Sequence, residues 1–331
     1  MLNCHLEVAI KALDSFENFY AQVTQIKREK NDSVIVIQYE EGQEKMRTMT
    51  GHNGKRFDRK VVLVTGASSG IGRQVCLDFS SQGAESIILV ARSQSKLEDL
   101  EKIIQERSTI ITAAYPCDIS KKTEVTSMGT EILNRFGRID ILVNNAGFGL
   151  YGKVQSQSID QIESTLFTNY LGTVNCTKVF LDSMIMRKSG HIVNIASVAA
   201  SFGIAGLSAY CASKYAILGF SESLSYELHG TGVKLTVVSP IGVKTGFFNN
   251  KTFGGRIPNY TGFMLEPKKV SSAILRAASS SRFEIIVPFY MRAGVWLKNT
   301  FPFIVKPLIG SHFRRELAKV NNAEKISDGL C

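Results

Sequence analysis

Three observations predict a doubly wound α/β fold, in which helices cover both faces of a parallel β-sheet. Short apolar segments alternate with helical ones between residues 58 and 290. Those segments are apolar along their whole length, as strands buried on both faces are. The chain has 331 residues, of which 44% are hydrophobic, so it can bury a core of the required size.

The predicted elements follow each other in the order that a parallel sheet requires. Predicted strands cover residues 61–64, 86–90, 110–115, 139–143, 190–196, 233–238 and 283–287. A glycine-rich turn and a helix follow the first strand, and further helices include 94–107 and 267–278, the latter with Pro267 in its first turn. Right-handed crossovers between such strands give the doubly wound arrangement.

Two segments flank this predicted domain of residues 58–290. Residues 1–57 contain a helical pattern from Leu6 to Ile26 and a hairpin pattern from Val34 to Thr50. One helix and one hairpin are too few to form an independent core, so this short extension is given no function. Residues 291–331 form an amphipathic tail of apolar, aromatic and basic residues, which begins at Met291.

The positive charge of the chain is concentrated at its C-terminal end. Residues 251–331 hold 13 Lys and Arg against five Asp and Glu, which is +8 of the total net charge of +10. Such a segment suggests an anionic partner that is a surface rather than a substrate, and no nucleic-acid partner is expected. The tail is expected either to lie on a membrane surface or to pack over the substrate cleft or against a partner subunit. No apolar run of 18 residues occurs, so the predicted location is cytoplasmic, or peripheral at a membrane.

A phosphate-binding turn is predicted directly after the first strand, in the segment Thr65–Gly72. Glycines let the backbone turn tightly and approach a pyrophosphate, and the following helix presents its N–H groups and positive dipole end. The candidate cofactor-binding residues in this turn are Gly66, Ser68, Ser69, Gly70, Ile71 and Gly72. The cysteines form no C-x-x-C pair and the histidines are scattered, so no metal is expected.

The end of the second predicted strand favours NADP(H) over NAD. An acidic residue there would bind a ribose hydroxyl, whereas Arg92 can bind a 2′-phosphate through paired N–H donors. Asp118, after the third strand, could accept a hydrogen bond from adenine. The turn that contains Asn145, Ala146 and Gly147 closes the carboxyl edge of the sheet, where ligands bind in such folds.

Tyr210 and Lys214 are the predicted chemical centre. Their spacing places both side chains on one face of a helix. A nearby ammonium favours phenolate, so we expect Lys214 to lower the pKa of Tyr210 and to prepare it for proton transfer. Ser197, at the end of the preceding strand, could donate a second hydrogen bond to the substrate oxygen.

These motifs together resemble the classical short-chain dehydrogenase/reductase family over residues 58–290. The resemblance implies a Rossmann-type domain, in which Tyr210 is the acid/base, Lys214 binds the nicotinamide ribose, Ser197 orients the carbonyl and Asn169 holds a water of a proton relay. It also implies contacts to nicotinamide from Pro240, Val243 and Thr245, although Ile241 stands where glycine is usual.

The resemblance further implies a substrate lid at residues 246–263, and a homodimer or homotetramer formed through helices near 160–185 and 210–228. The predicted activity is NADP(H)-dependent hydride transfer between nicotinamide and a small-molecule carbonyl/alcohol substrate, which is expected to be apolar or lipid-like because the pocket is expected to be mostly apolar. The residues that suggest this pocket are Phe148, Leu150, Tyr151, Phe202, Phe247 and Phe248. The alternative function is a non-catalytic NADP-binding sensor or scaffold.

Overall fold

The computed structural model describes residues 56–253 and 263–328, with the backbone alone from residue 319 onward. The chain divides into two units, Met1–Asn53 and Gly54–Cys331, and the described residues belong to the second. The helix and hairpin predicted between residues 6 and 50 lie outside them. So does most of the predicted lid, from residue 254 to 262.

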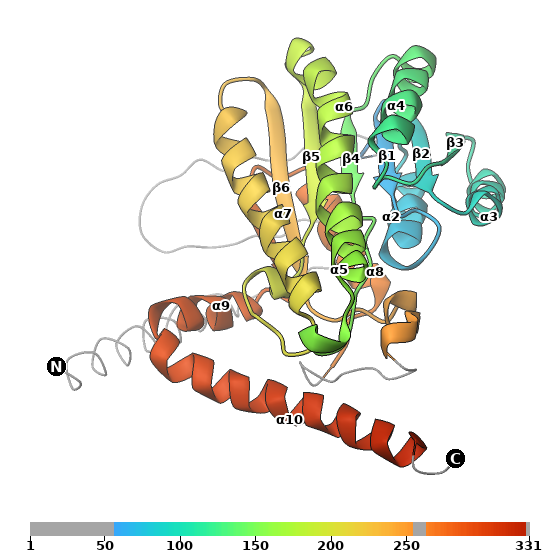
Figure 1. Ribbon diagram of the computed structural model, residues 1–331. Helices are drawn as coiled ribbons and strands as arrows, with labels where there is room; N and C mark the ends of the chain where they lie inside the picture. The colour runs from blue at the N-terminus through green and yellow to red at the C-terminus, as the bar shows by residue number, and fades with distance from the viewer. Residues whose placement is uncertain (1–55, 254–262, 329–331) are drawn as a thin grey trace, which may run out of the picture. The chain divides into compact units, whose positions relative to one another are not determined.

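Seven parallel strands form one sheet in the order β3-β2-β1-β4-β5-β6-β7 (Figure 1). The strands are β1 Val61–Thr65, β2 Ser86–Ala91, β3 Ile111–Pro116, β4 Ile141–Asn144, β5 Gly190–Ile195, β6 Val233–Pro240 and β7 Glu284–Val287. The strand order reverses between β1 and β4, which places a crevice at the carboxyl edge of these two strands. The doubly wound parallel fold is therefore confirmed.

Helices cover both faces of the sheet (Figure 1). Alternate residues of β1 explain why the strands are apolar throughout, because Val62 and Val64 belong to one hydrophobic cluster and Val61 and Leu63 to the other. The first cluster includes residues of α2 Gly70–Ser81, α3 Gln94–Gln105 and α8 Pro267–Ala277. The second includes residues of α4 Lys122–Phe136, α6 Gly172–Met186 and α7 Ser208–Glu227, and α5 Ile159–Leu166 packs against α7.

The predicted tail forms two helices, α9 Met291–Thr300 and α10 Pro302–Asp328. Proline disfavours a helical conformation in the residue before it, and the chain leaves the helix at Phe301 before Pro302 opens α10. Pro307 lies inside α10. Met291 and Ile309 pack against the first hydrophobic cluster, so the tail is part of the folded unit. None of the described helices is long and apolar enough to cross a membrane.

Candidate active site

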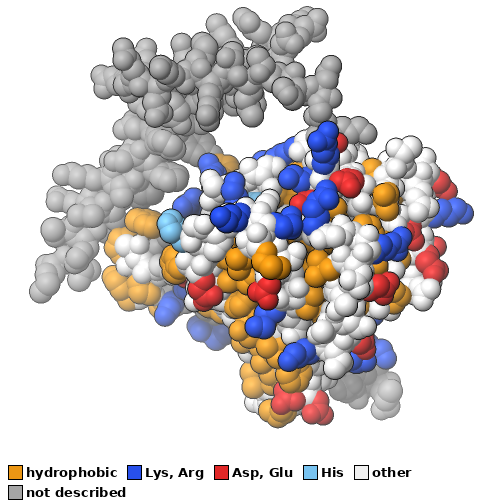
Figure 2. All heavy atoms as spheres, turned by 90° about the horizontal axis from the view of Figure 1, so that it is seen from above, with side chains coloured by type: hydrophobic (Ala, Val, Ile, Leu, Met, Phe, Trp, Pro, Cys, Tyr) orange, Lys and Arg blue, Asp and Glu red, His pale blue; other side chains and the backbone are white. Residues whose placement is uncertain are grey.

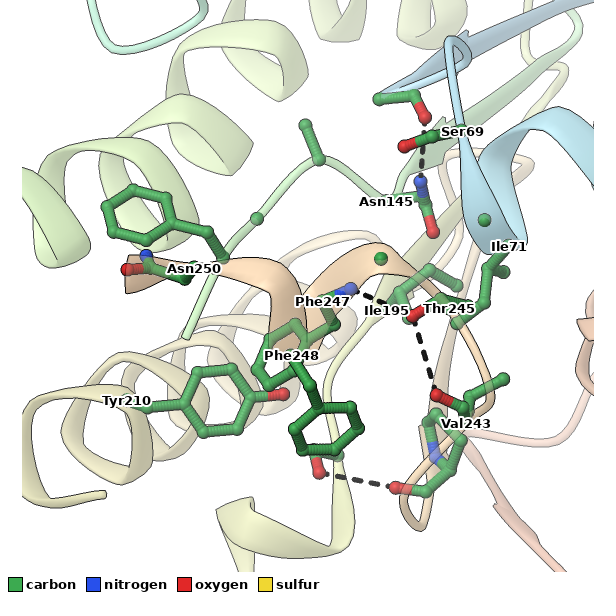
Figure 3. A pocket seen from close by; sticks show the side chains of 18 of the residues that line it. Ser69, Ile71, Asn145, Ile195, Tyr210, Val243, Thr245, Phe247, Phe248 and Asn250 are labelled. Atoms are coloured by element: carbon green, nitrogen blue, oxygen red, sulfur yellow. Dashed lines mark hydrogen bonds between the residues drawn. The ribbon is translucent and has the colours of Figure 1, made fainter. Parts of the chain in front are cut away.

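A cleft of about 960 Å³ opens at the carboxyl edge of the sheet. It is lined by every predicted site residue except Gly72 and Asn169. Figure 3 shows Tyr210 reaching into the cleft from α7, near Phe247 and Phe248, while Ser69, Ile71 and Asn145 lie toward the opposite side. The fold therefore brings the predicted chemical centre and the predicted phosphate-binding turn into one cavity.

The turn after β1 requires glycine at positions 66, 70 and 72. Gly66 and Gly70 have φ values of 66° and 54°, in the left-handed region that favours glycine. A Cβ atom on Gly72 would lie 2.2 Å from the backbone oxygen of Gly66, so Gly72 allows the helix to start close to the strand without lining the cleft itself. Ser69 is the N-cap of α2 and its side chain makes no capping hydrogen bond. The first N–H groups of α2 thus remain suited to an anion.

Thr65 fixes the second turn of the cofactor region. Its Oγ1 accepts hydrogen bonds from the backbone N–H groups of Asn145 and Ala146, each at 3.0 Å. The side chain of Asn145 donates back to the oxygen of Thr65 at 2.9 Å. These bonds join the ends of β1 and β4. This role of Thr65 was not predicted from the sequence, because nothing in the spacing pairs Thr65 with residues 80 positions later.

Positive charge gathers at the end of β2. Arg92 is exposed, and both Arg92 and Lys96 line the cleft. Burial opposes ionisation of Asp118, but hydrogen bonds from Ser120 and the positive charges of Arg92 and Lys121 hold its pKa below the ordinary value. Asp118 is therefore an anionic acceptor, and it is the single acidic residue that lines the described part of the cleft.

Ser197, Tyr210 and Lys214 lie at the junction of β5, β6 and α7. The Nζ atom of Lys214 donates to the oxygen of Ile195 at 2.7 Å and lies 5.7 Å from the centre of the Tyr210 ring. The Oγ atom of Ser197 donates to the oxygen of Pro240 at 3.2 Å and also interacts with the hydroxyl of Tyr210. Two hydroxyl groups and one amine thus converge on one side of the cleft.

Burial controls the ionisation of this group. It lowers the pKa of Lys214 to about 8, and it raises the pKa of Tyr210 although a hydrogen bond from Ser197 acts in the opposite direction. The expected lowering of the Tyr210 pKa by Lys214 is not found in the protein alone. The spacing of the two residues indicates the charge of Lys214 but not the desolvation of both groups, and desolvation is the larger effect here.

The lowered pKa of Lys214 predicts a pH-dependent stability. An unfolded chain keeps this proton up to a pH near 10.5, whereas the folded chain releases it near pH 8. Between these values the unfolded state binds more protons, so the stability of the wild type should rise with pH. Relative to Lys214→Met, the wild type should gain about 2–3 kcal/mol between pH 8 and 10.

Urea denaturation at pH 7, 8, 9 and 10 measures this difference. The control is Lys102→Met, which removes an exposed lysine of α3. If the free energy of unfolding changed with pH in the same way for the wild type and Lys214→Met, this would contradict the lowering of the Lys214 pKa by burial.

A single π-helical turn, Phe167–Leu171, joins α5 to α6 and holds Asn169. Such turns inside α-helices often occur at functional sites. Asn169 is fully buried; its Nδ2 donates to the oxygen of Phe148 at 3.0 Å and to Ser213 Oγ at 2.9 Å, and its Oδ1 accepts from the N–H of Phe148 at 3.0 Å. In this structure Asn169 therefore braces the cleft wall from behind. The partner Ser213, one turn after Tyr210, was not singled out in the sequence.

Phe247, in the visible part of the predicted lid, packs beside Tyr210 with ring centres 5.2 Å apart. A Cβ atom on Gly149 would lie 2.3 Å from the Phe247 ring, so only glycine leaves room for that ring. The Asn250 side chain donates to the oxygen of Gly149 at 3.0 Å and ties the two segments together. The start of the predicted lid thus lies beside the ring of Tyr210.

The aromatic pocket predicted from the sequence is partly wrong. Phe148, Phe247 and Phe248 line the cleft. The other three predicted residues, Leu150, Tyr151 and Phe202, do not line it, and their side chains are buried elsewhere in the protein. Apolar residues in loops after strands can face either the cleft or the core, and their sequence positions do not distinguish the two.

The family model described as short chain dehydrogenase matches residues 60–253. The chain is 34% identical over 262 residues to "Dehydrogenase/reductase SDR family protein 7-like" of Anopheles gambiae, covering 76% of this chain and 82% of the relative. It is 31% identical over 261 residues to "Epidermal retinol dehydrogenase 2" of Mus musculus, covering 78% and 83%.

Two solved structures share the fold. A short-chain dehydrogenase from Sphingobium yanoikuyae in complex with NADPH has a TM-score of 0.66 and 26% identity, covering 76% of this chain and 95% of that one. A short chain dehydrogenase/reductase from Burkholderia phymatum in complex with NAD also has a TM-score of 0.66, with 25% identity and coverages of 75% and 95%. Both nicotinamide cofactors therefore occur among the similar structures.

Proposed function

This chain belongs to the classical short-chain dehydrogenase/reductase family, which is a family of oxidoreductases, and we propose that it transfers hydride between NADP(H) and a carbonyl/alcohol pair. The observation that supports this most is the convergence of Tyr210, Ser197 and Lys214 in the cleft that also contains the glycine turn. A protein that only binds the cofactor has no need of a buried Tyr–Lys pair beside it.

The residues present fit a nicotinamide dinucleotide. The glycine turn and the start of α2 would hold the pyrophosphate, Asp118 the adenine, and Asn145, Ala146 and Gly147 the adjoining wall. Pro240, Val243 and Thr245 also line the cleft and would hold the nicotinamide. The bound cofactor supplies the hydride for reduction. Ile241, at the position where glycine is usual, is buried and its N–H bonds the oxygen of Val287, so its side chain is accommodated.

The protein side of the reaction is proton transfer and charge stabilisation. As the carbonyl carbon receives hydride, its oxygen gains negative charge and takes the hydroxyl proton of Tyr210. Ser197 donates a hydrogen bond to the same oxygen, and the ammonium of Lys214 stabilises the phenolate that forms. We propose that Asn169 holds a water molecule of the proton relay that returns a proton to Tyr210. Both the Oδ1 atom of Asn169 and the Nζ atom of Lys214 lie close to Gly147.

We propose NADP(H) rather than NAD on the strength of Arg92 and Lys96. Both line the cleft after β2, where a 2′-phosphate would lie, and no acidic residue lines that end of the described cleft except Asp118. A guanidinium binds a phosphate through two parallel N–H groups.

An apolar substrate is proposed from the aromatic rings beside Tyr210. Phe247 occupies space that a substrate must share, so Phe247→Ala should widen the site and lower KM for bulky ketones relative to small ones. We expect the ratio of kcat/KM between a bulky and a small ketone to rise by roughly 10-fold, the scale of one apolar contact.

Gly149→Ala is the matched variant for this prediction. Its methyl group displaces the Phe247 ring without removing it, so the same selectivity should shift in the same direction and by less. Steady-state kinetics with a ketone series measures both. Unchanged selectivity in both variants would contradict a role for Phe247 in substrate choice.

Oxidation of NADPH, followed by its absorbance, against ketones of increasing chain length tests the proposed function. Turnover of at least one ketone is the expected result. Tight NADPH binding without turnover of any ketone would instead support the alternative, a non-catalytic NADP-binding sensor or scaffold.

We also propose a cytoplasmic homo-oligomer, a dimer or tetramer formed through α6 and α7. The exposed apolar residues on these helices are Met186, Tyr215 and Tyr226, with exposed fractions of 77%, 42% and 70%. Light scattering of the purified protein measures the number of subunits.

A further inference from the structure

Helices α9 and α10 have two different sides. Their inner side packs on the domain, where Val305 and Phe313 are both 8% exposed and Leu317 contacts the cluster around Tyr151 and Leu207. Their outer side exposes large apolar residues. These are Phe289 and Tyr290 just before α9, then Trp296, Leu297, Phe303, Ile304 and Leu308. We call this set the outer apolar surface.

The exposed charged side chains that the structure describes on these two helices, up to residue 318, all have one sign. Arg292, Lys306, Arg314 and Arg315 are exposed, while Glu316 is half-buried and is the single acidic residue between 289 and 318. The opposite end of the domain differs, because Lys, Arg, Asp and Glu side chains are mixed over the face seen in Figure 2. Basic residues among exposed Trp, Phe and Leu are typical of helices that lie in the headgroup region of an anionic bilayer.

The outer apolar surface is next to the mouth of the cleft. Phe263 lines the cleft, and its ring centre lies 6.4 Å from that of Tyr290 in the outer surface. Lys298 of α9 donates to the oxygen of Ser201 and lies over the ring of Phe202, in the loop after β5. The two helices are therefore fixed to the same loops that border the active site.

We propose that the outer apolar surface of α9 and α10 binds an anionic lipid bilayer and that the cleft opens toward it, so that a membrane-dissolved carbonyl compound enters from the lipid. The nature of this substrate rests on the proposed function, whereas the lipid contact does not. A second copy of the chain fits this surface poorly, because two such surfaces would bring like charges together.

Trp296 makes the lipid contact measurable without a label. It is the only tryptophan of the chain and is 50% exposed. With vesicles of phosphatidylcholine and phosphatidylserine, its fluorescence should shift to the blue, and lipids brominated on their acyl chains should quench it. Pure phosphatidylcholine vesicles should give a much weaker response.

Charge reversal tests the surface directly. The triple variant Lys306→Glu, Arg314→Glu, Arg315→Glu should weaken vesicle binding by about 100-fold or more, because each basic residue near an anionic surface contributes about a factor of five. The matched control reverses three exposed lysines elsewhere, Lys102→Glu, Lys122→Glu and Lys234→Glu, with the same change in net charge. The control should bind within a few-fold of wild type.

Three outcomes would overturn the proposal. These are no blue shift with anionic vesicles, equal loss in the test and control triples, and a Trp296 shift that depends on protein concentration without vesicles, which would indicate a second copy instead. NADPH turnover with a short water-soluble ketone separates the two claims. It should be unchanged in the test triple, and its absence in the wild type would contradict the proposed function alone.

Discussion

Tyr210→Phe should lower kcat for ketone reduction by about 10³-fold, within the range that general acid–base catalysis contributes. The variant keeps the ring that packs on Phe247 and loses only the hydroxyl that gives the proton. Binding of NADPH should change little, because the glycine turn and Arg92 lie at the other end of the cleft. Steady-state kinetics and titration of NADPH fluorescence measure the two quantities separately.

Tyr215→Phe is the control on the same helix. Tyr215 is 42% exposed, does not line the cleft and should be replaceable without loss of kcat. If Tyr210→Phe kept kcat within about threefold of the wild type, another group would have to supply the proton.

Replacing Arg92 should have the second largest effect, and it acts on the cofactor. Hydrogen bonds to charged groups contribute about 1.5–3 kcal/mol, so Arg92→Asp should raise KM for NADPH by roughly 10- to 100-fold. The new carboxylate can accept from a ribose hydroxyl, so KM for NADH should fall. kcat with saturating cofactor should stay near the wild-type value, because Arg92 follows β2, and β1 and β4 separate this strand from β5, next to which Ser197 and Tyr210 lie.

Lys102→Asp in α3 is the control for net charge, since it removes another exposed basic residue near the same strand. Equal preference for the two cofactors in the wild type, unchanged in Arg92→Asp, would contradict the role of Arg92. The similar structures contain both NAD and NADPH, so this measurement decides the cofactor.

The fold, and the nearness of Tyr210 to Lys214, could be predicted because both rest on local pattern, whereas Asn169 was predicted only through the family resemblance. Apolar strands such as Val61–Thr65 alternate with helices, and the spacing of Tyr210 and Lys214 places them on one face of α7. What could not be predicted depends on tertiary neighbours. Thr65 and Ser213 act through bonds to residues far away in sequence, and Tyr151 is buried in a cluster instead of lining the cleft.

The pKa shift of Tyr210 was predicted in the wrong direction for the protein without cofactor. Spacing reveals that Lys214 is near Tyr210, but it does not reveal how deeply both groups are buried. Burial raises the pKa of Tyr210 and lowers that of Lys214, which leaves less positive charge to favour the phenolate. The sequence of the tail did not distinguish between packing on the domain and contact with a membrane surface. The structure packs one side of α9 and α10 beside the cleft and exposes the other.

Transfer of deuterium from the nicotinamide to the substrate tests the central proposal most directly. NADPH that carries deuterium on the transferred position of C4 is incubated with the protein and a ketone, and the alcohol is analysed by mass spectrometry. We predict one deuterium on the carbinol carbon with the wild type and essentially none with Tyr210→Phe over the same time. Alcohol without deuterium, or NADPH consumption without alcohol, would contradict hydride transfer between NADP(H) and a carbonyl in this cleft.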